Sequence, residues 1–515
     1  MVILNKDIQL SCTLCIVIMW VRQMKGEQEM KKGVKQCWKL LVAVMMFVMV
    51  LTTGVKAQAA TWVTINDKNF PEKGVREQLI SEAKSDWYNY YKYSNGKYYI
   101  DISRVTNFYY GNTKKPIKNM GFLKKFKKLN SVNIVTNNET VTFPASVKSV
   151  SITTTNKKLT VKAPGATYLQ VNGTENTSLK IKNSKKIQSL YVYTLKEVTG
   201  LSNLKRLESF TAYNYNGTGL NFTRNPKLNS ISVVKCPNLV SLRYPDRISY
   251  LAIKNTGIKQ LDVSGLKNLT ELEVSSNKNI HNIDLSKNSN LQFLRANCSQ
   301  ITNLDIRKNK KLTSLECYES KLSGLKIGRN SKLTNLNINN NKNLKSIDVT
   351  KCPNLQSLNV SCTSMKTLNV TKNKKIEQIY VSGNKKMKRL NVTKCPNLRL
   401  LQIDYTGISS INLTRNKKLE VLAPNKVMKV TGLKRDVSLY YYKAKKGMVV
   451  QLKGIIGSGY KKSNGYGGAR FNPKTMKAQA NGEEYTTMVL KKGNKQHDVI
   501  FMGWDNTYNG SDVEF

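Results

Sequence analysis

Histidine is scarce in this sequence of 515 residues, which contains only His281 and His497. That count argues against histidine-rich metal sites and paired-histidine chemistry. The sequence also lacks the GxxxxGK phosphate loop, the HExxH zinc motif, and a GxGxxG segment between a strand and a helix. These absences favour binding over catalysis and predict no cofactor.

Acidic residues are also few, with 32 Asp and Glu against 84 Lys and Arg, which gives a formal net charge of +52. Apolar residues make up 40% of the chain, enough for a core, so it is not a disordered polycation. Residues 1–59 hold eight basic and three acidic residues, which leaves +47 from residue 60 onward. We therefore expect an acidic polymer or a surface protein as partner, no specific nucleic acid, and at most peripheral membrane contact.

Uninterrupted apolar runs in this chain are short. The run Leu40–Leu51 follows four lysines and precedes Ala57-Gln58-Ala59, a pattern typical of a signal peptide cleaved near Ala60. Twelve apolar residues are too few for a stable membrane anchor. We interpret residues 1–59 as an upstream extension and signal peptide, the extension reflecting either a start assigned too early or a long signal region. With no LPxTG-like sortase motif, the expected location is secreted or non-covalently attached to the cell surface.

A repeat begins clearly near residue 258, with apolar residues spaced as apolar-x-x-apolar-x-apolar. Examples are Leu312/Leu315/Cys317 and Leu333/Leu336/Ile338. Successive starts lie 10 or 11 residues apart, so two half-units make a coil of 21 or 22 residues, at the short end of the leucine-rich-repeat range. A half-unit this short has no room for a three-turn helix. We therefore expect a mainly β solenoid with a short strand on each face, nearly straight because both faces have similar width.

The expected organisation is an N-terminal cap at 60–116, a solenoid at 117–424 and a β-rich C-terminal domain at 425–515, either a β-sandwich or a cap on the last coil. In that domain, His497 next to Asp498 leaves a Ser-His-Asp arrangement open. No GxSxG motif marks a nucleophile, so a surface His-Asp pair is the favoured interpretation.

The repeats resemble those of secreted bacterial leucine-rich-repeat proteins of the internalin-like group, in which runs such as LDLSKNxxLxxLxC recur. Residues 65–71, Val75-Arg76 and Val105-Thr106 resemble the cap that precedes the repeats in this group. Members often carry a calcium-like D-x-N-x-D-G loop within the cap. Here residues 93–98 have too few carboxylates, so we assign no metal site. The resemblance implies a fold, and much less about function.

One basic residue recurs in each coil, beside an Asn that we expect to suit the turn through left-handed φ. Neighbours in this basic stripe should lie about 5 Å apart, a spacing that matches a linear polyanion. The alternative is a solvated turn that needs only soluble residues. The stripe comprises Lys287, Lys308, Arg329, Lys351, Lys372, Lys394 and Arg415.

The other half-unit varies more outside its core positions, and its strands should point aromatic and polar side chains outward. Exposed aromatics among amides suit sugar stacking or a protein partner, although single surface aromatics are also common. The candidate residues of this variable strand face are Phe293, Arg295, Tyr318, Tyr380, Gln402 and Asp404.

Asp284 and Asp305 occupy equivalent positions in adjacent coils, about 5 Å apart at strand spacing. Such a pair could serve a retaining glycosidase or a calcium site. The same column, however, contains Asn369, Asn391 and Asn412, which can act neither as acid nor as base. A structural role along the turn is therefore the favoured interpretation.

The leading hypothesis is an exported, non-enzymatic leucine-rich-repeat binding protein or adhesin that engages acidic glycans, envelope polymers or host surface proteins. A solenoid carbohydrate-active enzyme using Asp284 and Asp305, and a structural surface-coat component held by charge, remain as alternatives. Six cysteines follow residue 60, and their column positions predict mostly free thiols.

Overall fold

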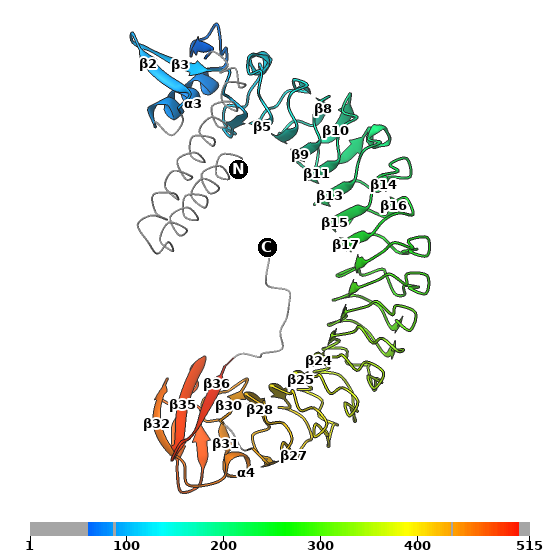
Figure 1. Ribbon diagram of the computed structural model, residues 1–515, viewed down its shortest axis with the longest axis vertical. Helices are drawn as coiled ribbons and strands as arrows, with labels where there is room; N and C mark the ends of the chain where they lie inside the picture. The colour runs from blue at the N-terminus through cyan, green and yellow to red at the C-terminus, as the bar shows by residue number, and fades with distance from the viewer. Residues whose placement is uncertain (1–59, 86–88, 434–435, 504–515) are drawn as a thin grey trace, which may run out of the picture.

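The computed structural model describes residues 60–85, 89–433 and 436–503. The predicted signal peptide lies outside these residues. The chain winds into a solenoid that follows a pronounced arc, with the N-terminal cap at one end and the C-terminal β strands at the other (Figure 1). No helix in the described residues is long and apolar enough to cross a membrane.

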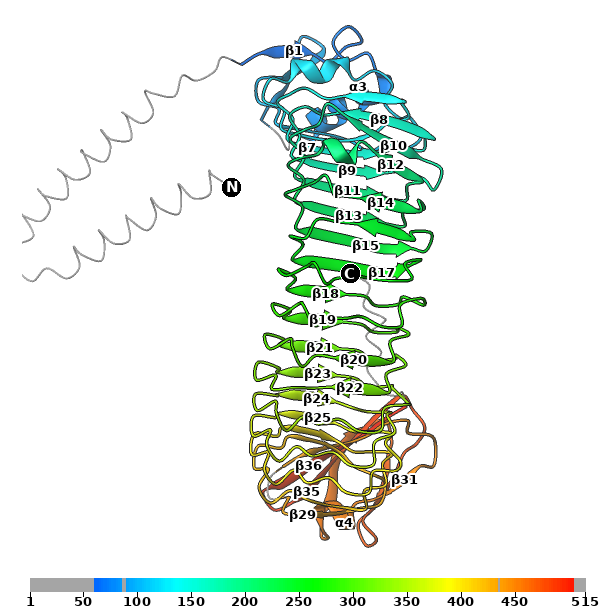
Figure 2. The same ribbon diagram turned by 90° about the vertical axis from the view of Figure 1, so that its right-hand side faces the viewer.

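A parallel sheet of one strand per coil lines the inner side of the arc (Figures 1 and 2). Leu294, Leu315, Leu336 and Leu358 occupy the same register position in successive strands, which confirms the predicted coil of 21 or 22 residues. Each is fully buried. The sheet consists of β4 (Asn107–Tyr110), β5 (Ser131–Val135), β7 (Ser149–Thr153), β9 (Tyr168–Asn172), β11 (Ser189–Tyr193), β13 (Ser209–Tyr213), β15 (Ser230–Cys236), β17 (Tyr250–Thr256), β18 (Glu271–Glu273), β19 (Phe293–Arg295), β21 (Ser314–Glu316), β23 (Asn335–Asn337), β24 (Ser357–Asn359), β25 (Gln378–Tyr380), β26 (Leu400–Gln402), β28 (Val421–Ala423) and β30 (Ser438–Tyr441).

Strands on the outer side of the arc occur in separate groups. Parallel pairing joins β6 (Thr140–Thr142), β8 (Lys158–Lys162), β10 (Ser178–Lys182) and β12 (Glu197–Thr199); β14 (Gly219–Asn221) and β16 (Ser241–Arg243); β20 (Asn303–Asp305) and β22 (Gly324–Lys326); and β27 (Ser410–Asn412) and β29 (Lys429–Thr431). Elsewhere the described outer segments are turns or irregular chain, with short 3-10 helices at Gly121–Lys125 and Leu201–Asn203.

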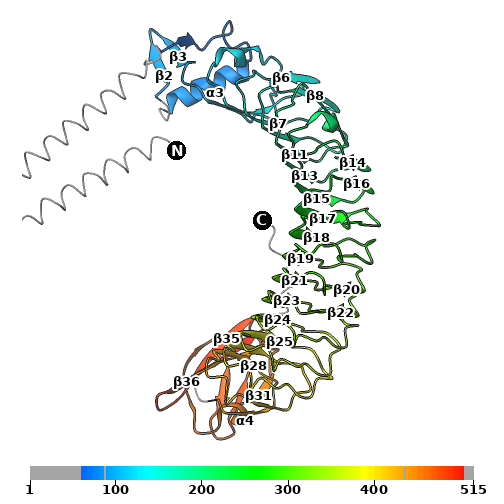
Figure 3. The ribbon, with the colours of Figure 1, turned by 45° about the vertical axis from the view of Figure 1, so that its right-hand side comes forward.

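The expectation of a nearly straight solenoid is wrong, as the arc in Figure 3 shows. Inner strands hydrogen-bond to each other from coil to coil, which holds them at strand spacing. The outer segments pair only within their groups, so their coils can spread apart. Equal half-unit lengths in the sequence therefore do not mean equal widths of the two faces.

The N-terminal cap covers the open end of the core. Helix α3 (Lys73–Lys84) buries Val75 and Leu79, and it accompanies an antiparallel sheet of β1 (Trp62–Thr64), β2 (Tyr91–Ser94) and β3 (Lys97–Asp101). Phe70 places its ring centroid 5.9 Å from that of Phe122, in an aromatic cluster beneath the cap. The supposed calcium-like segment forms the β2–β3 hairpin turn, where Asn95 and Gly96 both have positive φ.

At the other end, the inner sheet continues into the C-terminal region. Strand β36 (Lys495–Met502) pairs in parallel with β30, while β35 (Tyr485–Lys492) and β32 (Lys461–Tyr466) extend the sheet antiparallel. A second sheet contains β31 (Val449–Gln451), β34 (Lys477–Gln479) and β33 (Arg470–Asn472), beside helix α4 (Lys453–Ile456). The C-terminal strands thus continue the inner sheet beyond the last coil.

Candidate functional site

The seven residues of the basic stripe lie on one rim of the solenoid, in the turns that lead from the outer side into the inner strands. All seven side chains are exposed. They follow each other at 21 or 22 residues, one per coil, as the inner-strand register does. The same turns expose further basic residues that the sequence reasoning did not single out: Arg307, Lys310, Lys311, Lys332, Lys374, Lys375, Lys417 and Lys418. Together these residues form what we call the basic rim.

A ladder of buried asparagines holds these turns in place. The side-chain amide of Asn309 donates to the carbonyl oxygens of Leu285 at 3.0 Å and Asn288 at 2.8 Å, both one coil back. Asn288, Asn330, Asn373 and Asn416 make equivalent pairs of bonds. The expectation that these asparagines adopt left-handed φ is wrong, because none has positive φ. Positive φ instead recurs at the opposite turn, for example at Cys298, Glu319 and Asn340.

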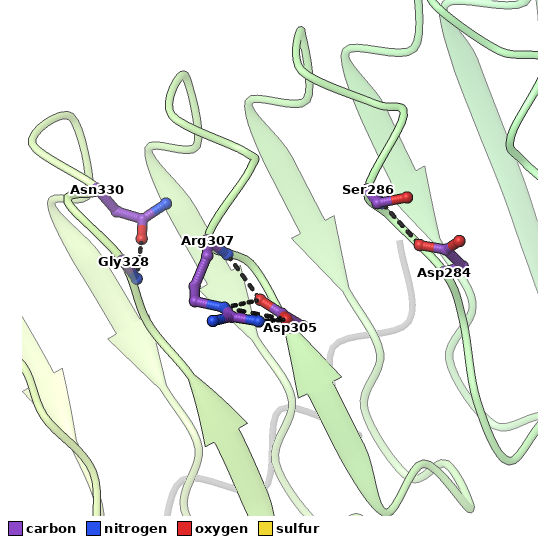
Figure 4. Close-up of polar contacts among 6 residues, drawn as sticks. All are labelled: Asp284, Ser286, Asp305, Arg307, Gly328 and Asn330. Atoms are coloured by element: carbon purple, nitrogen blue, oxygen red, sulfur yellow. Dashed lines mark hydrogen bonds and ion pairs between the residues drawn. The ribbon is translucent and has the colours of Figure 1, made fainter.

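Asp284 and Asp305 each accept a backbone N–H of the turn that follows them (Figure 4). Asp284 accepts the backbone N–H of Ser286 at 2.8 Å, and Asp305 accepts that of Arg307 at 3.0 Å. The Arg307 guanidinium also donates to Asp305, with Nη2 2.7 Å from Oδ2. Asn369, Asn391 and Asn412 accept the N–H two residues on in the same way. The residues of this column thus have the same function, which is to accept the backbone N–H two residues further on. Either a carboxylate or an amide can do this.

The pKa values of the two carboxyls also speak against acid catalysis. The N–H of Ser286 lowers the pKa of Asp284, and the Arg307 side chain lowers that of Asp305. A glycosidase needs one carboxyl with a raised pKa to protonate the leaving group. Within the described residues, no group of three or more His, Cys, Asp or Glu side chains could hold a metal ion.

The structure places the six residues of the variable strand face in two different environments. Phe293 is 42% exposed, and Arg295 is also exposed and pairs with Glu316 of the next coil, with 3.3 Å from Nε to Oε2. Tyr318 and Tyr380 are partly buried, which raises the pKa of both phenols. These four remain at the inner surface.

Gln402 and Asp404 were expected to point outward, but they are only 4% and 5% exposed. The C-terminal strands lie beside the last coils on the inner side of the arc (Figure 3). Tyr405, next to Asp404, donates a hydrogen bond to the carbonyl oxygen of Tyr442 at 2.6 Å, and the Ser382 hydroxyl donates to Asp404. Both residues are therefore buried, and Asp404 stands next to the contact that Tyr405 makes with the C-terminal region.

The favoured surface His-Asp pair is also wrong. His497 is 4% exposed, its Nδ1 lies 3.0 Å from the carbonyl oxygen of Val437, and its ring packs against Tyr460. Burial lowers its pKa. Adjacent residues of a strand point to opposite faces, so His497 and Asp498 in β36 cannot work together.

Sequence reasoning also missed the inner surface of the N-terminal coils, where β9, β11 and β13 carry four tyrosines. The ring centroids of Tyr168 and Tyr191 lie 5.2 Å apart, and those of Tyr193 and Tyr213 lie 6.4 Å apart. Coils here vary in length, and that variation hides the register in the sequence. Alternation of apolar and polar residues within each strand was the available signal.

No protein-family model and no curated protein match this sequence. Solved structures to which it is similar include the functional domain of InlJ from Listeria monocytogenes, with 16% identity, a TM-score of 0.38 and coverage of 86% of this chain and 99% of that one. The internalin InlF of the same species has 16% identity, a TM-score of 0.44 and coverage of 72% and 98%. YopM from Yersinia enterocolitica has 18% identity, a TM-score of 0.48 and coverage of 61% and 73%.

At these identities the likeness concerns the fold alone. The predicted leucine-rich-repeat solenoid is confirmed by the register of the coils themselves.

Proposed function

We propose that this chain is an exported, non-enzymatic leucine-rich-repeat binding protein whose basic rim holds an acidic polymer of the cell envelope or of a host surface. A rigid, repetitive scaffold of this kind suits binding or adhesion. The proposal of export is supported by the signal-like residues 30–60, and the proposal of a bound acidic polymer is supported by the basic rim. The two parts can therefore be tested separately.

The observation that carries the proposal is the basic stripe, with one exposed Lys or Arg in each of seven consecutive coils. At about 5 Å spacing, neighbouring like charges repel by roughly 1 kcal/mol in water before salt screening. The ion pairs of this region, Arg295–Glu316, Arg307–Asp305 and Arg399–Glu420, include none of the seven. A polyanion lying along the rim would relieve this repulsion and release its counterions.

Replacing Lys308, Arg329, Lys351 and Lys372 by Gln tests the proposal, because Gln keeps side-chain polarity while four charges are removed. Affinity for teichoic acid or heparin, measured by calorimetry over a salt series, should fall, and so should the salt dependence of binding. In the unaltered protein, binding should weaken steeply as salt rises.

The matched control removes four lysines of the C-terminal region, Lys445, Lys446, Lys461 and Lys462, all exposed. This variant should lose much less affinity than the stripe variant. Equal losses would show that diffuse charge binds the polymer and that the stripe is only a soluble turn. Incubation with pectins, glycosaminoglycans and mucins should release no new reducing ends or unsaturated products; release of either would favour the enzyme hypothesis.

A further inference from the structure

The inner surface over β7, β9, β11, β13 and β15 has no charged side chain at its outward strand positions, in a chain with a net charge of +52. Charged residues are anchored only at its borders: Lys148 and Glu208 just before the strands, and Lys235 near the end of β15. Of these, Lys235 reaches over the edge of the surface, with its Nζ 5.1 Å from the centroid of the Tyr213 ring. We call this area the tyrosine surface. Its outward residues are Ser149, Ser151, Thr153, Tyr168, Gln170, Asn172, Ser189, Tyr191, Tyr193, Ser209, Thr211, Tyr213, Ser230, Ser232 and Val234.

Strand register brings the aromatic rings of this surface together. Gln170, Tyr191 and Thr211 share one row across β9, β11 and β13, and Asn172, Tyr193 and Tyr213 share the next. Tyr193 and Tyr213 are therefore direct cross-strand neighbours, whereas Tyr168 lies opposite Ser189 and meets the Tyr191 ring diagonally. Each of the four tyrosines is partly exposed, so the pairs offer apolar ring surface next to polar groups.

Hydrogen bonds hold the polar side chains between these rings in defined positions. The Tyr168 hydroxyl donates to Gln170 Oε1 at 2.7 Å, and Gln170 Nε2 donates to Asn172 Oδ1 at 3.3 Å. Asn172 Nδ2 in turn donates to Thr153 Oγ1 at 3.3 Å on the neighbouring strand. Each amide nitrogen has two N–H groups, so both amides keep a donor for a ligand. Side chains ordered in advance lose less entropy when they bind.

The charge pattern selects the kind of ligand. A polyanion, single-stranded nucleic acid included, needs cations along its path, and here the outward strand positions supply none. A polycation finds no carboxylate at the same positions. What the surface does offer is ring faces on β9, β11 and β13, amides on β9, and hydroxyls on each of the five strands. An uncharged sugar chain has the matching groups: C–H faces that stack on tyrosine and hydroxyls that exchange hydrogen bonds with amides.

We infer that the tyrosine surface is a second binding site, separate from the basic rim, and that it takes an uncharged oligosaccharide. Its strands follow each other at about 4.8 Å, so the rings and polar groups of several coils can contact one extended chain. This inference does not depend on the polyanion bound by the rim, because none of the residues concerned belongs to the rim.

Saturation-transfer NMR and calorimetry on the full chain, with hexasaccharides of glucose, mannose and N-acetylglucosamine as probes, test the inference. At least one probe should bind, and its affinity should stay nearly constant between about 50 and about 500 mM salt, since no charges pair. Replacing Tyr168 and Tyr191 by Ser should weaken binding by about tenfold or more. Replacing both by Phe, which keeps the rings, should retain most of the affinity.

Tyr466→Ser with Tyr485→Ser is the matched control, because these exposed tyrosines stand on β32 and β35 of the same sheet, outside the tyrosine surface. This pair should bind the probe like the unaltered chain, and thermal melting should show that both Ser variants fold. Equal losses in the two Ser variants would overturn the placement. The inference is also overturned if no uncharged probe binds at millimolar concentration, an outcome that would point to a protein partner for this surface, or if binding weakens steeply with salt.

Discussion

The side-chain oxygen of Asn330 accepts the backbone N–H of Gly328 at 2.8 Å (Figure 4). In the two preceding coils the equivalent N–H groups, of Ser286 and Arg307, donate instead to Asp284 and Asp305. The coil of Gly328 has Lys326 at the aspartate position, and a lysine cannot accept this bond. In each turn of the rim, the equivalent backbone N–H is therefore hydrogen-bonded, and the acceptor is whichever nearby side chain can provide one.

This exchange predicts different costs for two similar substitutions. Asn330→Ala removes donors to Ile306 and Asn309 and the acceptor for Gly328, whereas Asn309→Ala removes only its two donated bonds. Buried polar groups left without partners cost about 1–3 kcal/mol each. Urea unfolding should therefore show a loss of roughly 2–4 kcal/mol for Asn309→Ala and a larger loss for Asn330→Ala.

Adding Lys326→Asp to the Asn330→Ala variant should recover part of the lost stability, because a carboxylate at position 326 can accept the Gly328 N–H. In the Asn309→Ala background, Asn330 still accepts the Gly328 N–H, so no comparable gain from Lys326→Asp is expected there. Equal effects of Lys326→Asp in both backgrounds would show that charge, and not the backbone bond, is responsible.

At the position of Asp284, replacement by Asn should leave the stability of the protein unchanged, whereas replacement by Ala should lower it slightly. Asp284→Asn keeps an acceptor for the Ser286 N–H, as Asn369 does for Thr371, so the free energy of unfolding should hardly change. Asp284→Ala removes the acceptor at an exposed turn and should cost no more than about 1 kcal/mol. If Asp284→Asn abolished binding or an enzymatic activity while stability held, the structural role assigned to this carboxylate would be wrong.

The core of the solenoid predicts a clear contrast between neighbours. Leu336 is fully buried in β23, and Leu336→Ala should cost roughly 2–5 kcal/mol in urea unfolding. Asn337, next in the strand, points to the inner surface and is partly exposed, so Asn337→Ala should cost far less. Circular dichroism of the unaltered protein should show strand and irregular structure with little helix; a helix-rich spectrum would contradict the fold.

Buried thiols predict a loss of stability at high pH. No disulfide joins the six described cysteines, and burial raises the pKa of Cys317 to about 12 and of Cys236, Cys352 and Cys395 to about 11. Unfolding returns these thiols to their ordinary pKa near 9, so the unfolded state gives up protons first. Stability should thus be intact below pH 9 and fall as pH rises toward 11.

Urea unfolding at pH 8, 9, 10 and 11 measures this effect, and replacing the four buried cysteines by Ala tests its cause. The Ala variant should start less stable but lose less between pH 9 and 11. An equal loss in both proteins would assign the alkaline transition to tyrosine or lysine instead.

The sequence by itself determined the coil of this protein. Leucine spacing of 10 or 11 residues predicted which side chains are buried, including Leu315, Leu336 and Cys317, because a strand alternates its side chains between core and surface. The spacing of the basic stripe predicted one exposed charge per coil for the same geometric reason. The sequence also indicated a structural role for Asp284 and Asp305, since Asn at the same position in other coils means that only a hydrogen-bond acceptor is needed there.

Tertiary structure alone decided what depends on contacts between coils or with the ends. Curvature follows from continuous pairing on the inner side and interrupted pairing on the outer side, which no single half-unit encodes. Gln402 and Asp404 are buried in the last coils, where the neighbouring Tyr405 bonds to Tyr442, 37 residues further along the chain. The uncharged tyrosine surface exists only because register sets Tyr193 beside Tyr213, and lysines are displaced to the borders and the rims. A periodic sequence determines its own coil, whereas the neighbours of that coil depend on how all the coils stack.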